Sequence, residues 1–277
     1  MELKKLGYRV LVAIFGIPII IFLVVKGGWA IVVLVLIINL LAQYEFYKLT
    51  ELKKMLPIKI LGLVGTVIFT ISFYKYGTEK FWLITIIFFY LTLLFELFRN
   101  KASATFNISA TSLGFFYPAF FFSFIILIRE LPKSLNLDYA AGARWIIFMF
   151  AAIWICDTAA YFIGSAIGKH KLFHRVSPNK TVEGAIAGFI FAIVTAYIAH
   201  TVYIKLLSLA DCLVIGAIVG IMSQIGDLVE SLFKRDTGIK DTSGILPGHG
   251  GFLDRFDAPL FVAPLVFLYL RFIVFPK

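Results

Sequence analysis

The sequence has few of the charged residues that cover the surface of a soluble protein. Asp, Glu, Lys and Arg make up 15% of its 277 residues, hydrophobic residues make up 61%, and mean hydropathy is +0.95. Soluble domains are only about 45–50% apolar. This composition excludes a soluble domain of any size. It predicts an all-α polytopic integral membrane protein.

Cysteine is also scarce, with only Cys156 and Cys212 in the chain. Both fall within predicted membrane spans, too few and too buried for a disulfide framework or a zinc site, so we interpret them as inert packing residues. No internal repeat of fixed period is evident, which argues against a transporter built from duplicated halves. Nucleic acid is not an expected partner, because no soluble basic domain is present to dock a duplex.

What the sequence does contain is a succession of apolar runs, each of about 20 residues, the length that crosses a bilayer. They predict about nine transmembrane helices, which lie near 7–25, 28–45, 58–74, 81–98, 112–128, 144–163, 183–203, 211–230 and 255–274. Basic residues precede the first run, but no small-residue cleavage site follows it. We therefore interpret it as a retained helix and not as a signal peptide.

The positions of the basic residues set the orientation. With a cytoplasmic N-terminus, most of the 26 lysines and arginines fall in cytoplasmic segments, as the positive-inside rule requires. This bias accounts for the net charge of +10, to which attraction for anionic lipid headgroups would add. We expect a single membrane domain, 1–277, in the cytoplasmic membrane, with lipid-facing and packing spans over 1–140 and the spans that carry the polar clusters over 141–277. Its polar loops 164–182 and 231–254 face the cytoplasm.

The first of three polar clusters that interrupt the apolar pattern is Asp157, within the sixth span. An ionised carboxylate in hydrocarbon is costly unless it is paired or hydrated. Asp157 is therefore either the packing partner of a lysine or a site carboxylate that faces a polar cavity.

The second cluster is the loop from Gly164 to Gly184. Its glycine spacing does not fit a Walker A motif, and His170 follows Lys169 where Ser or Thr is required.

Within this loop, the segment SPNKT (Ser177–Thr181) carries more information. The Ser-Pro step favours extended backbone, and Asn179 or Thr181 can cap the following helix. Lys180 then lies near a helix N-terminus, a combination that favours an anion between them. A simple positive-inside loop is the alternative interpretation.

The third cluster begins inside the eighth span. Ser223, Asp227, Ser231 and Lys234 share one helical face, since they recur at intervals of four, four and three residues. A polar stripe at the cytoplasmic end of a membrane helix indicates a hydrated cleft. Asp227 is the type of hard oxygen ligand that Mg²⁺ prefers, and Lys234 with Arg235 can bind phosphate.

Glycines and carboxylates extend this cluster to Asp257. Gly250 and Gly251 allow backbone N–H groups to approach an oxyanion. Asp254 and Asp257, three residues apart at the start of the last helix, form a second carboxylate pair. His249 is a candidate acid or base, with a turn-stabilising or phosphate-contacting role as the alternative.

From Ser231 to Asp257 the chain reads SxFKRxxxxKDxSxxLPxHGGFxDRFD. This pattern resembles the signature of the phosphatidate cytidylyltransferases (CDP-diacylglycerol synthases). Gly226-Asp227, Cys156-Asp157 and the SPNKT segment also resemble the bacterial members. The resemblance implies that CTP and phosphatidic acid give CDP-diacylglycerol and pyrophosphate, with Mg²⁺ alone or together with a second metal or a monovalent cation such as K⁺.

The resemblance and the residue chemistry together assign roles to the polar side chains. The expected catalytic residues are Asp227, Lys234, Arg235, Lys240, His249 and Asp254. The expected substrate contacts are Ser177, Asn179, Lys180, Ser223, Ser231, Gly250, Gly251 and Arg255. The expected metal ligands are Asp227 and Asp254, with Asp157 and Asp257 as further candidates.

The expected partners are CTP, phosphatidic acid and membrane lipids. A homodimer is a further candidate, because the GxxxG pairs Gly184/Gly188 and Gly216/Gly220 indicate close helix packing either within one chain or between two. Two alternative functions stay open at this point. One is nucleotidyl transfer to another lipid phosphate, such as an ether-linked or polyprenyl one. The other is an ion or anion transporter, which would explain Asp157 and Asp227 but not the long basic loop.

Overall fold

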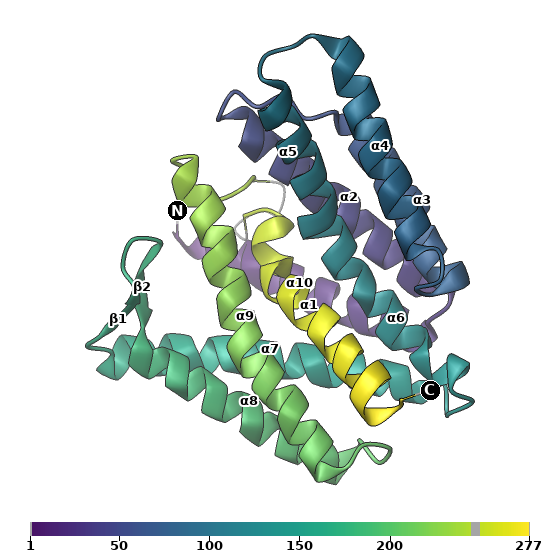
Figure 1. Cartoon of the computed structure of the whole chain (residues 1–277). Coiled ribbons are helices and arrows are strands. Elements are labelled where there is room, and N and C mark those ends of the chain that lie inside the picture. The colour runs from purple at the N-terminus through teal and green to yellow at the C-terminus, as the bar shows by residue number, and fades with distance from the viewer. Residues whose placement is uncertain (1, 245–249, 277) are drawn as a thin grey trace. The chain divides into compact units, whose positions relative to one another are not determined.

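The structure, a computed structural model, describes residues 2–244 and 250–276, with side chains from residue 14 onward. Its helices are α1 (Glu2–Lys26), α2 (Trp29–Glu51), α3 (Lys59–Tyr76), α4 (Phe81–Arg99), α5 (Ala104–Gly114), α6 (Phe121–Ser134), α7 (Ala140–Ile167), α8 (Val182–Val202), α9 (Leu209–Asp236) and α10 (Leu253–Tyr269). Two π-helical segments, η1 (Phe115–Phe120) and η2 (Leu270–Val274), continue α5 and α10. The predicted all-α class is confirmed (Figure 1).

Within the described residues, eight helical segments are long and apolar enough to cross a membrane. They are Trp29–Glu51, Lys59–Tyr76, Phe81–Arg99, Ala104–Ser134, Ala140–Ile167, Val182–Val202, Leu209–Asp236 and Leu253–Val274. Each matches one predicted span from the second to the ninth. The first predicted span lies in α1, where Ile14–Lys26 forms a shorter apolar helix.

The outward faces of these helices suit lipid. On α4, Trp82, Leu97 and Phe98 are each at least 70% exposed, and the other long helices also carry exposed large apolar side chains. Exposed apolar surface of this extent is destabilising in water and normal in a bilayer. The chain is therefore a polytopic membrane protein.

Two compact units make up the described chain. One contains residues from Met1–Leu127 and Asp236–Phe256, and the other contains residues from Ile128–Arg235 and Asp257–Lys277. The divisions fall within α6, α9 and α10, so these helices contribute residues to both units. The predicted division of one membrane domain into packing spans before residue 140 and catalytic spans after it stays a prediction.

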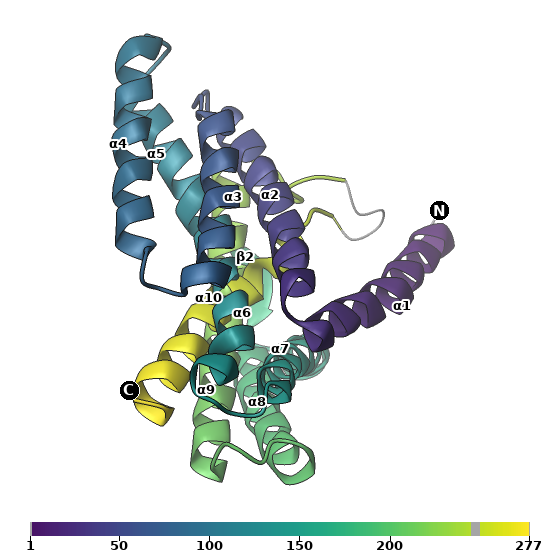
Figure 2. The same cartoon turned by 90° about the vertical axis from the view of Figure 1, so that its right-hand side faces the viewer.

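The first unit packs α2, α3 and η1 around a cluster of aromatic rings. Phe69 contacts Phe73 and Phe115, with ring centroids 4.3 Å and 5.3 Å apart. Buried polar side chains pair with one another among these helices; for example, Thr66 donates to Gln43 Oε1 at 2.7 Å. Such pairing offsets the free-energy cost of burying polar groups away from water. Figure 2 shows α2 and α3 side by side.

The second unit is organised by glycines on its helices. A Cβ at Gly188 of α8 would lie 2.9 Å from the carbonyl oxygen of Cys156 on α7, and a Cβ at Gly220 of α9 would lie 3.0 Å from Phe189 Cα on α8. Gly184 and Gly216 meet α7 and α8 in the same way. Both GxxxG pairs therefore mark close packing within the chain, while a homodimer stays a prediction.

The polar loop between α7 and α8 folds into a hairpin that the sequence did not predict. β1 (Lys171–Phe173) pairs antiparallel with β2 (Ser177–Thr181), so the SPNKT segment is extended, as its Ser-Pro step indicates. Thr181 caps α8 as predicted, since its hydroxyl accepts a hydrogen bond from Gly184 N at 3.2 Å. The hairpin fixes Lys180 at the base of α8.

Candidate active site

The polar stripe on α9 begins with a buried residue that ties two helices together. Ser223 is fully buried, and its hydroxyl donates to Cys156 Sγ on α7 at 3.6 Å. Cys156 and Cys212 are both free and buried, which confirms the packing role predicted for them. This end of the stripe holds α9 in place, and the chemistry lies further along the helix.

Lys180 and Asp227 come together from separate elements. Lys180 Nζ on β2 lies 2.5 Å from Asp227 Oδ2 on α9, and the two side chains are 29% and 35% exposed. In this structure the anionic group beside Lys180 is the Asp227 carboxylate, and the role of Lys180 in substrate binding stays a prediction. Partial exposure leaves both groups accessible to a ligand.

Asp257 of α10 completes a carboxylate pair with Asp227. A Cβ at Gly226 would lie 2.6 Å from the carbonyl oxygen of Asp257, so only glycine lets α9 and α10 approach this closely. This close approach of the helices brings the two carboxyl groups near enough to interact electrostatically. Asp257 is buried, and its Oδ1 accepts from Ala258 N at 2.8 Å. Two ionised carboxylates at this separation repel unless a proton or a cation lies between them.

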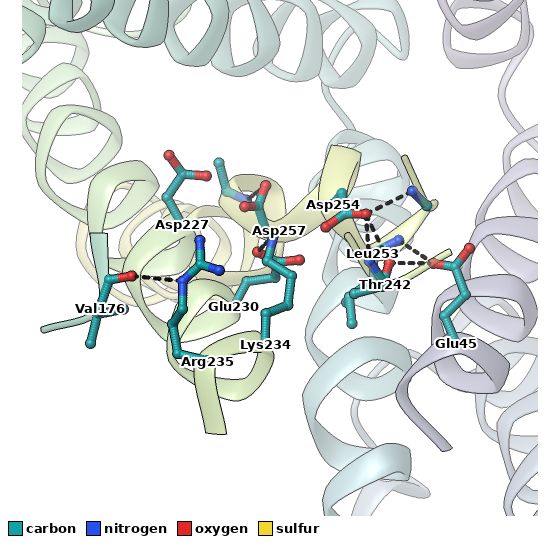
Figure 3. Close-up of polar contacts among 12 residues, drawn as sticks. Glu45, Val176, Asp227, Glu230, Lys234, Arg235, Thr242, Leu253, Asp254 and Asp257 are labelled. Carbon is teal, nitrogen blue, oxygen red and sulfur yellow. Dashed lines mark hydrogen bonds and ion pairs between the residues drawn. The ribbon is translucent and has the colours of Figure 1, made fainter. Parts of the chain in front are cut away.

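One turn further along α9, Lys234 pairs with Glu230. Their charged atoms are 2.5 Å apart and the side chains are 12% and 2% exposed. Glu230 was not among the predicted site residues, although its spacing of four residues from Lys234 is typical of a helical ion pair. Arg235, the next cation, donates from Nε to Val176 O at 3.3 Å and so contacts the turn of the hairpin (Figure 3).

Asp157 lies on α7 with its side chain exposed. It is close enough to Asp227 and Lys180 to interact with both electrostatically. The lysine-partner interpretation fits less well, because the nearest lysine already pairs with Asp227.

We call these six side chains the lysine–carboxylate cluster: Asp157, Lys180, Asp227, Glu230, Lys234 and Asp257. With every group ionised, four carboxylates and two lysines carry a formal charge of −2. Among the described residues, no three Asp, Glu, His or Cys side chains are arranged as a complete metal site. Mg²⁺ does not need one, since it commonly binds one or two carboxylates and takes its remaining ligands from water and substrate phosphates. The Asp227–Asp257 pair fits that mode of binding.

The other unit contains a second polar centre, around Asp254. Asp254 Oδ2 accepts hydrogen bonds from Thr242 Oγ1 at 2.9 Å, Thr242 N at 3.0 Å and Gly251 N at 2.7 Å. Gly250 turns the chain with φ of +83°, a conformation that favours glycine. The Gly251 amide predicted to face an oxyanion is therefore engaged by a carboxylate of the protein. Roles for Asp254 in metal binding and for both glycines in substrate binding stay predictions.

Glu45 is the residue of this centre that the sequence analysis missed. It is fully buried on α2, and its carboxylate accepts hydrogen bonds from Thr242, Ser243, Phe252 and Leu253. Figure 3 shows the contacts with Thr242 and Leu253. The signal that could have found it is the one that singled out Asp157, namely a carboxylate within an apolar helix.

The remaining predicted residues are exposed or half-buried, or lie outside the residues that the structure describes. Asn179, Lys240 and Arg255 are exposed, Ser177 and Ser231 are half-buried, and His249 lies outside the described residues. Their roles stay predictions.

The fold defines a polytopic membrane protein, and the lysine–carboxylate cluster gathers ionisable side chains from three of its helices and the hairpin. The chain belongs to the cytidylyltransferase family, whose model matches residues 7–273. It is 34% identical to the phosphatidate cytidylyltransferase of Bacillus subtilis (strain 168) over 271 residues, which cover 95% of this chain and 96% of that protein.

Two further relatives carry the same name. The phosphatidate cytidylyltransferase of Synechocystis is 30% identical over 289 residues, covering 95% of both chains. That of Staphylococcus saprophyticus is 46% identical over 129 residues, which cover 47% of this chain and 50% of the relative. Similarity to two of these proteins thus extends over nearly the whole chain.

Proposed function

We propose that this protein transfers the cytidylyl group of CTP to phosphatidic acid, giving CDP-diacylglycerol and pyrophosphate. Membership of the cytidylyltransferase family and near full-length similarity to phosphatidate cytidylyltransferases support the proposal. The observation on which it rests most directly is the lysine–carboxylate cluster, where Lys180 pairs with Asp227 beside the buried Asp257.

The reaction demands electrostatics more than acid–base chemistry. A phosphate oxygen of the lipid attacks the α-phosphorus of CTP, and the bond from that phosphorus to the oxygen bridging to the β-phosphate breaks. The nucleophile is already an anion, so it needs no strong base. The protein must instead hold two repelling anions in line and offset the charge on the leaving pyrophosphate.

The cluster offers groups for both tasks. We assign Lys180 and Lys234 to the phosphates of the substrates, where each exchanges its carboxylate partner for a phosphate oxygen. Lys240 and Arg235 are further cations of the same motif. Charge-assisted contacts of this kind hold CTP in place without a change in its protonation state.

Asp227 and Asp257 would hold Mg²⁺, with phosphate oxygens of CTP among its other ligands. When bound, the ion offsets negative charge on the reacting and leaving phosphates. Asp157, at the exposed edge of the cluster, is a further candidate ligand. Asp254 stays a candidate too, although three donors of its own loop engage its Oδ2 atom. A second metal or K⁺ stays a prediction.

The substrates set the orientation that we propose. CTP comes from the cytoplasm, so the loops 164–182 and 231–254 face that side of the cytoplasmic membrane, in agreement with the positions of the basic residues. Both acyl chains of phosphatidic acid stay in the leaflet while its phosphate reaches the level of the headgroups.

Incorporation of radiolabelled CTP into lipid by the purified protein tests the proposal. We expect labelled CDP-diacylglycerol when Mg²⁺ and phosphatidic acid are present and none when either is omitted. Product with another lipid phosphate, such as a polyprenyl one, and none with phosphatidic acid would change the substrate. Solute flux in liposomes without nucleotide turnover would replace the proposal with transport.

A further inference from the structure

Glu45 has no part in the chemistry assigned so far, yet its side chain has the most complete set of hydrogen bonds near the motif. It lies on α2, is 0% exposed, and uses both carboxylate oxygens. Oε1 accepts from Ser243 Oγ at 2.5 Å and from Phe252 N at 3.1 Å. Oε2 accepts from Leu253 N at 2.8 Å and from Thr242 Oγ1 at 3.2 Å.

These donors come from two separate stretches of the Ser231–Asp257 motif. Thr242 and Ser243 provide side-chain hydroxyls before the Gly250–Gly251 turn, and Phe252 and Leu253 provide backbone amides after it. Because α10 begins at Leu253, the two amides belong to the group of N–H donors that a helix leaves without intrahelical partners. A carboxylate at this position is also favoured by the helix dipole. Glu45 thus caps α10 from another helix and fastens both stretches at once.

The same stretches determine where Asp254 points. The Thr242 hydroxyl lies between the two carboxylates, 3.2 Å from Glu45 Oε2 and 2.9 Å from Asp254 Oδ2, and its single proton can be donated to either. Gly251 donates its amide to Asp254. A Cβ at Gly251 would lie 2.5 Å from Glu45 Oε2, so any larger residue there would displace the carboxylate. A shift of Glu45 therefore moves Asp254 and the glycine turn together.

We infer that Glu45 is a positioning residue for cytidylyl transfer. Its carboxylate holds Thr242–Ser243 and Gly250–Asp254 in the conformation in which Asp254 and the Gly250–Gly251 turn serve the reaction, while it does not contact either substrate. This inference rests on the proposed function for its kinetic consequence, but its structural consequence, a fastened segment, can be measured without any substrate.

Glu45→Gln is the substitution that separates positioning from folding. Glutamine has the shape of glutamate but replaces one acceptor oxygen with an NH₂ group, which would face two donors. We expect kcat per folded molecule to fall by about tenfold or more, since each buried donor left without an acceptor is destabilising. We expect amide hydrogen exchange in residues 250–256 to become faster by a similar factor. Glu51→Gln is the matched control, because Glu51 lies on the same helix with its side chain 37% exposed, and there both measurements should stay unchanged.

The outcomes are distinguishable. Wild-type kcat and unchanged exchange in a folded Glu45→Gln protein would overturn the inference. A lower yield of folded protein, with normal kcat for the molecules that do fold, would also overturn it, because Glu45 would then serve folding alone. If Glu45→Gln yields no folded protein, Ser243→Ala tests the positioning role instead, because it removes one donor to Glu45 and keeps the buried charge. A lower kcat in Ser243→Ala supports positioning, and a normal kcat contradicts it. If the wild type makes no CDP-diacylglycerol, the proposed function fails, and the exchange measurement still decides whether Glu45 fastens the segment.

Discussion

At the scale of single residues, the site is defined by carboxylates that lie closer together than their charges favour. Asp227 and Asp257 lie near enough to interact electrostatically, and Asp257 is only 6% exposed, so solvent screens its charge weakly. The arrangement is stable only with a proton, a lysine or a metal ion nearby. Single substitutions can therefore separate the contribution of each group.

The first residue-scale prediction concerns the carboxylate pair itself. Asp227→Asn or Asp257→Asn should lower turnover at least about 100-fold, because loss of a metal ligand should exceed the roughly 10–100-fold effect of losing an outer-shell partner. The thermal midpoint of Asp257→Asn should stay equal or rise, since the substitution removes one of two repelling charges at a buried position. Initial rates of CDP-diacylglycerol formation and thermal unfolding in detergent measure the two effects.

The matched control for this pair is Asp138→Asn. Asp138 forms an exposed ion pair with Arg144 at 3.0 Å, and such pairs contribute little to stability. Its turnover and midpoint should equal those of the wild type. Full activity in either Asp227→Asn or Asp257→Asn would contradict the metal assignment.

The second residue-scale prediction concerns Lys180. Lys180→Met should raise the KM for CTP by about tenfold or more, because a charge-assisted hydrogen bond to phosphate is lost. It should also lower the thermal midpoint, since Asp227 loses its partner next to Asp257. Lys171→Met, on the exposed neighbouring strand, is the control and should change neither quantity. An unchanged KM in Lys180→Met would remove Lys180 from the CTP site.

At the scale of helices and strands, glycine positions determine how closely the site-bearing helices approach. Gly226 lies directly before Asp227, and the backbone of Asp257 occupies the space that a side chain at position 226 would need. The sequence pair Gly226-Asp227 thus combines a contact point with a functional group. The packing of α9 against α10 and the pairing of Asp227 with Asp257 therefore both depend on the close approach of the two helices at Gly226.

Gly226→Ala tests this dependence. The added methyl group would force α9 and α10 apart, which should cost about 1–3 kcal/mol of stability and lower turnover as Asp227 and Asp257 separate. Gly16→Ala is the control, since among the described residues no atom beyond the adjoining backbone of its own helix lies within 4 Å of a Cβ there, and alanine favours a helix. Thermal midpoints and initial rates should fall in the first variant and hold or rise in the second. A Gly226→Ala protein with normal turnover would contradict the proposed coupling.

Sequence reasoning found the helices because a bilayer demands long apolar runs. The span predicted at 183–203 is α8, Val182–Val202, and the one at 255–274 is α10 with η2. It did not find the π-helical segment η1, where Pro118 removes a backbone donor within a helix that nevertheless continues. The predicted helical face that extends past the end of the eighth span at residue 230 to Lys234 agrees with α9, which continues to Asp236.

The site was predictable in its chemistry and less so in its pairing. Asp227, Lys180 and Asp257 were recognisable as ionisable groups at membrane helices, but the Lys180–Asp227 contact joins residues 47 positions apart and leaves no local pattern. The contact of Glu45 with Leu253 joins residues 208 positions apart. Composition and spacing report on neighbours along one helix, and only the fold brings such distant groups together.

At the scale of the whole molecule, the distribution of charge predicts which loops face the cytoplasm. Lys101→Cys, in the loop before α5, should react with a membrane-impermeant maleimide only after the cells are opened. Glu79→Cys, in the loop between α3 and α4, should react in intact cells. Both side chains are exposed, and the buried Cys156 and Cys212 should give the unsubstituted protein a low baseline. The reverse pattern of labelling would invert the orientation and exclude a site that draws CTP from the cytoplasm.

The stability of the whole chain should also report on metal binding before any substrate is present. A ligand that binds only the folded protein stabilises it, by about 2.7 kcal/mol when its concentration is about 100 times its Kd. Mg²⁺ should therefore raise the thermal midpoint of the chelator-treated wild type, and EDTA should reverse both this rise and enzymatic turnover. In Asp227→Asn the rise should disappear while Asp138→Asn keeps it, because only the first removes a ligand from the lysine–carboxylate cluster. Equal stabilisation of all three proteins would place the ion outside the lysine–carboxylate cluster. Stabilisation that appears only with CTP would mean that the phosphates of the nucleotide provide most of the ligands of the ion.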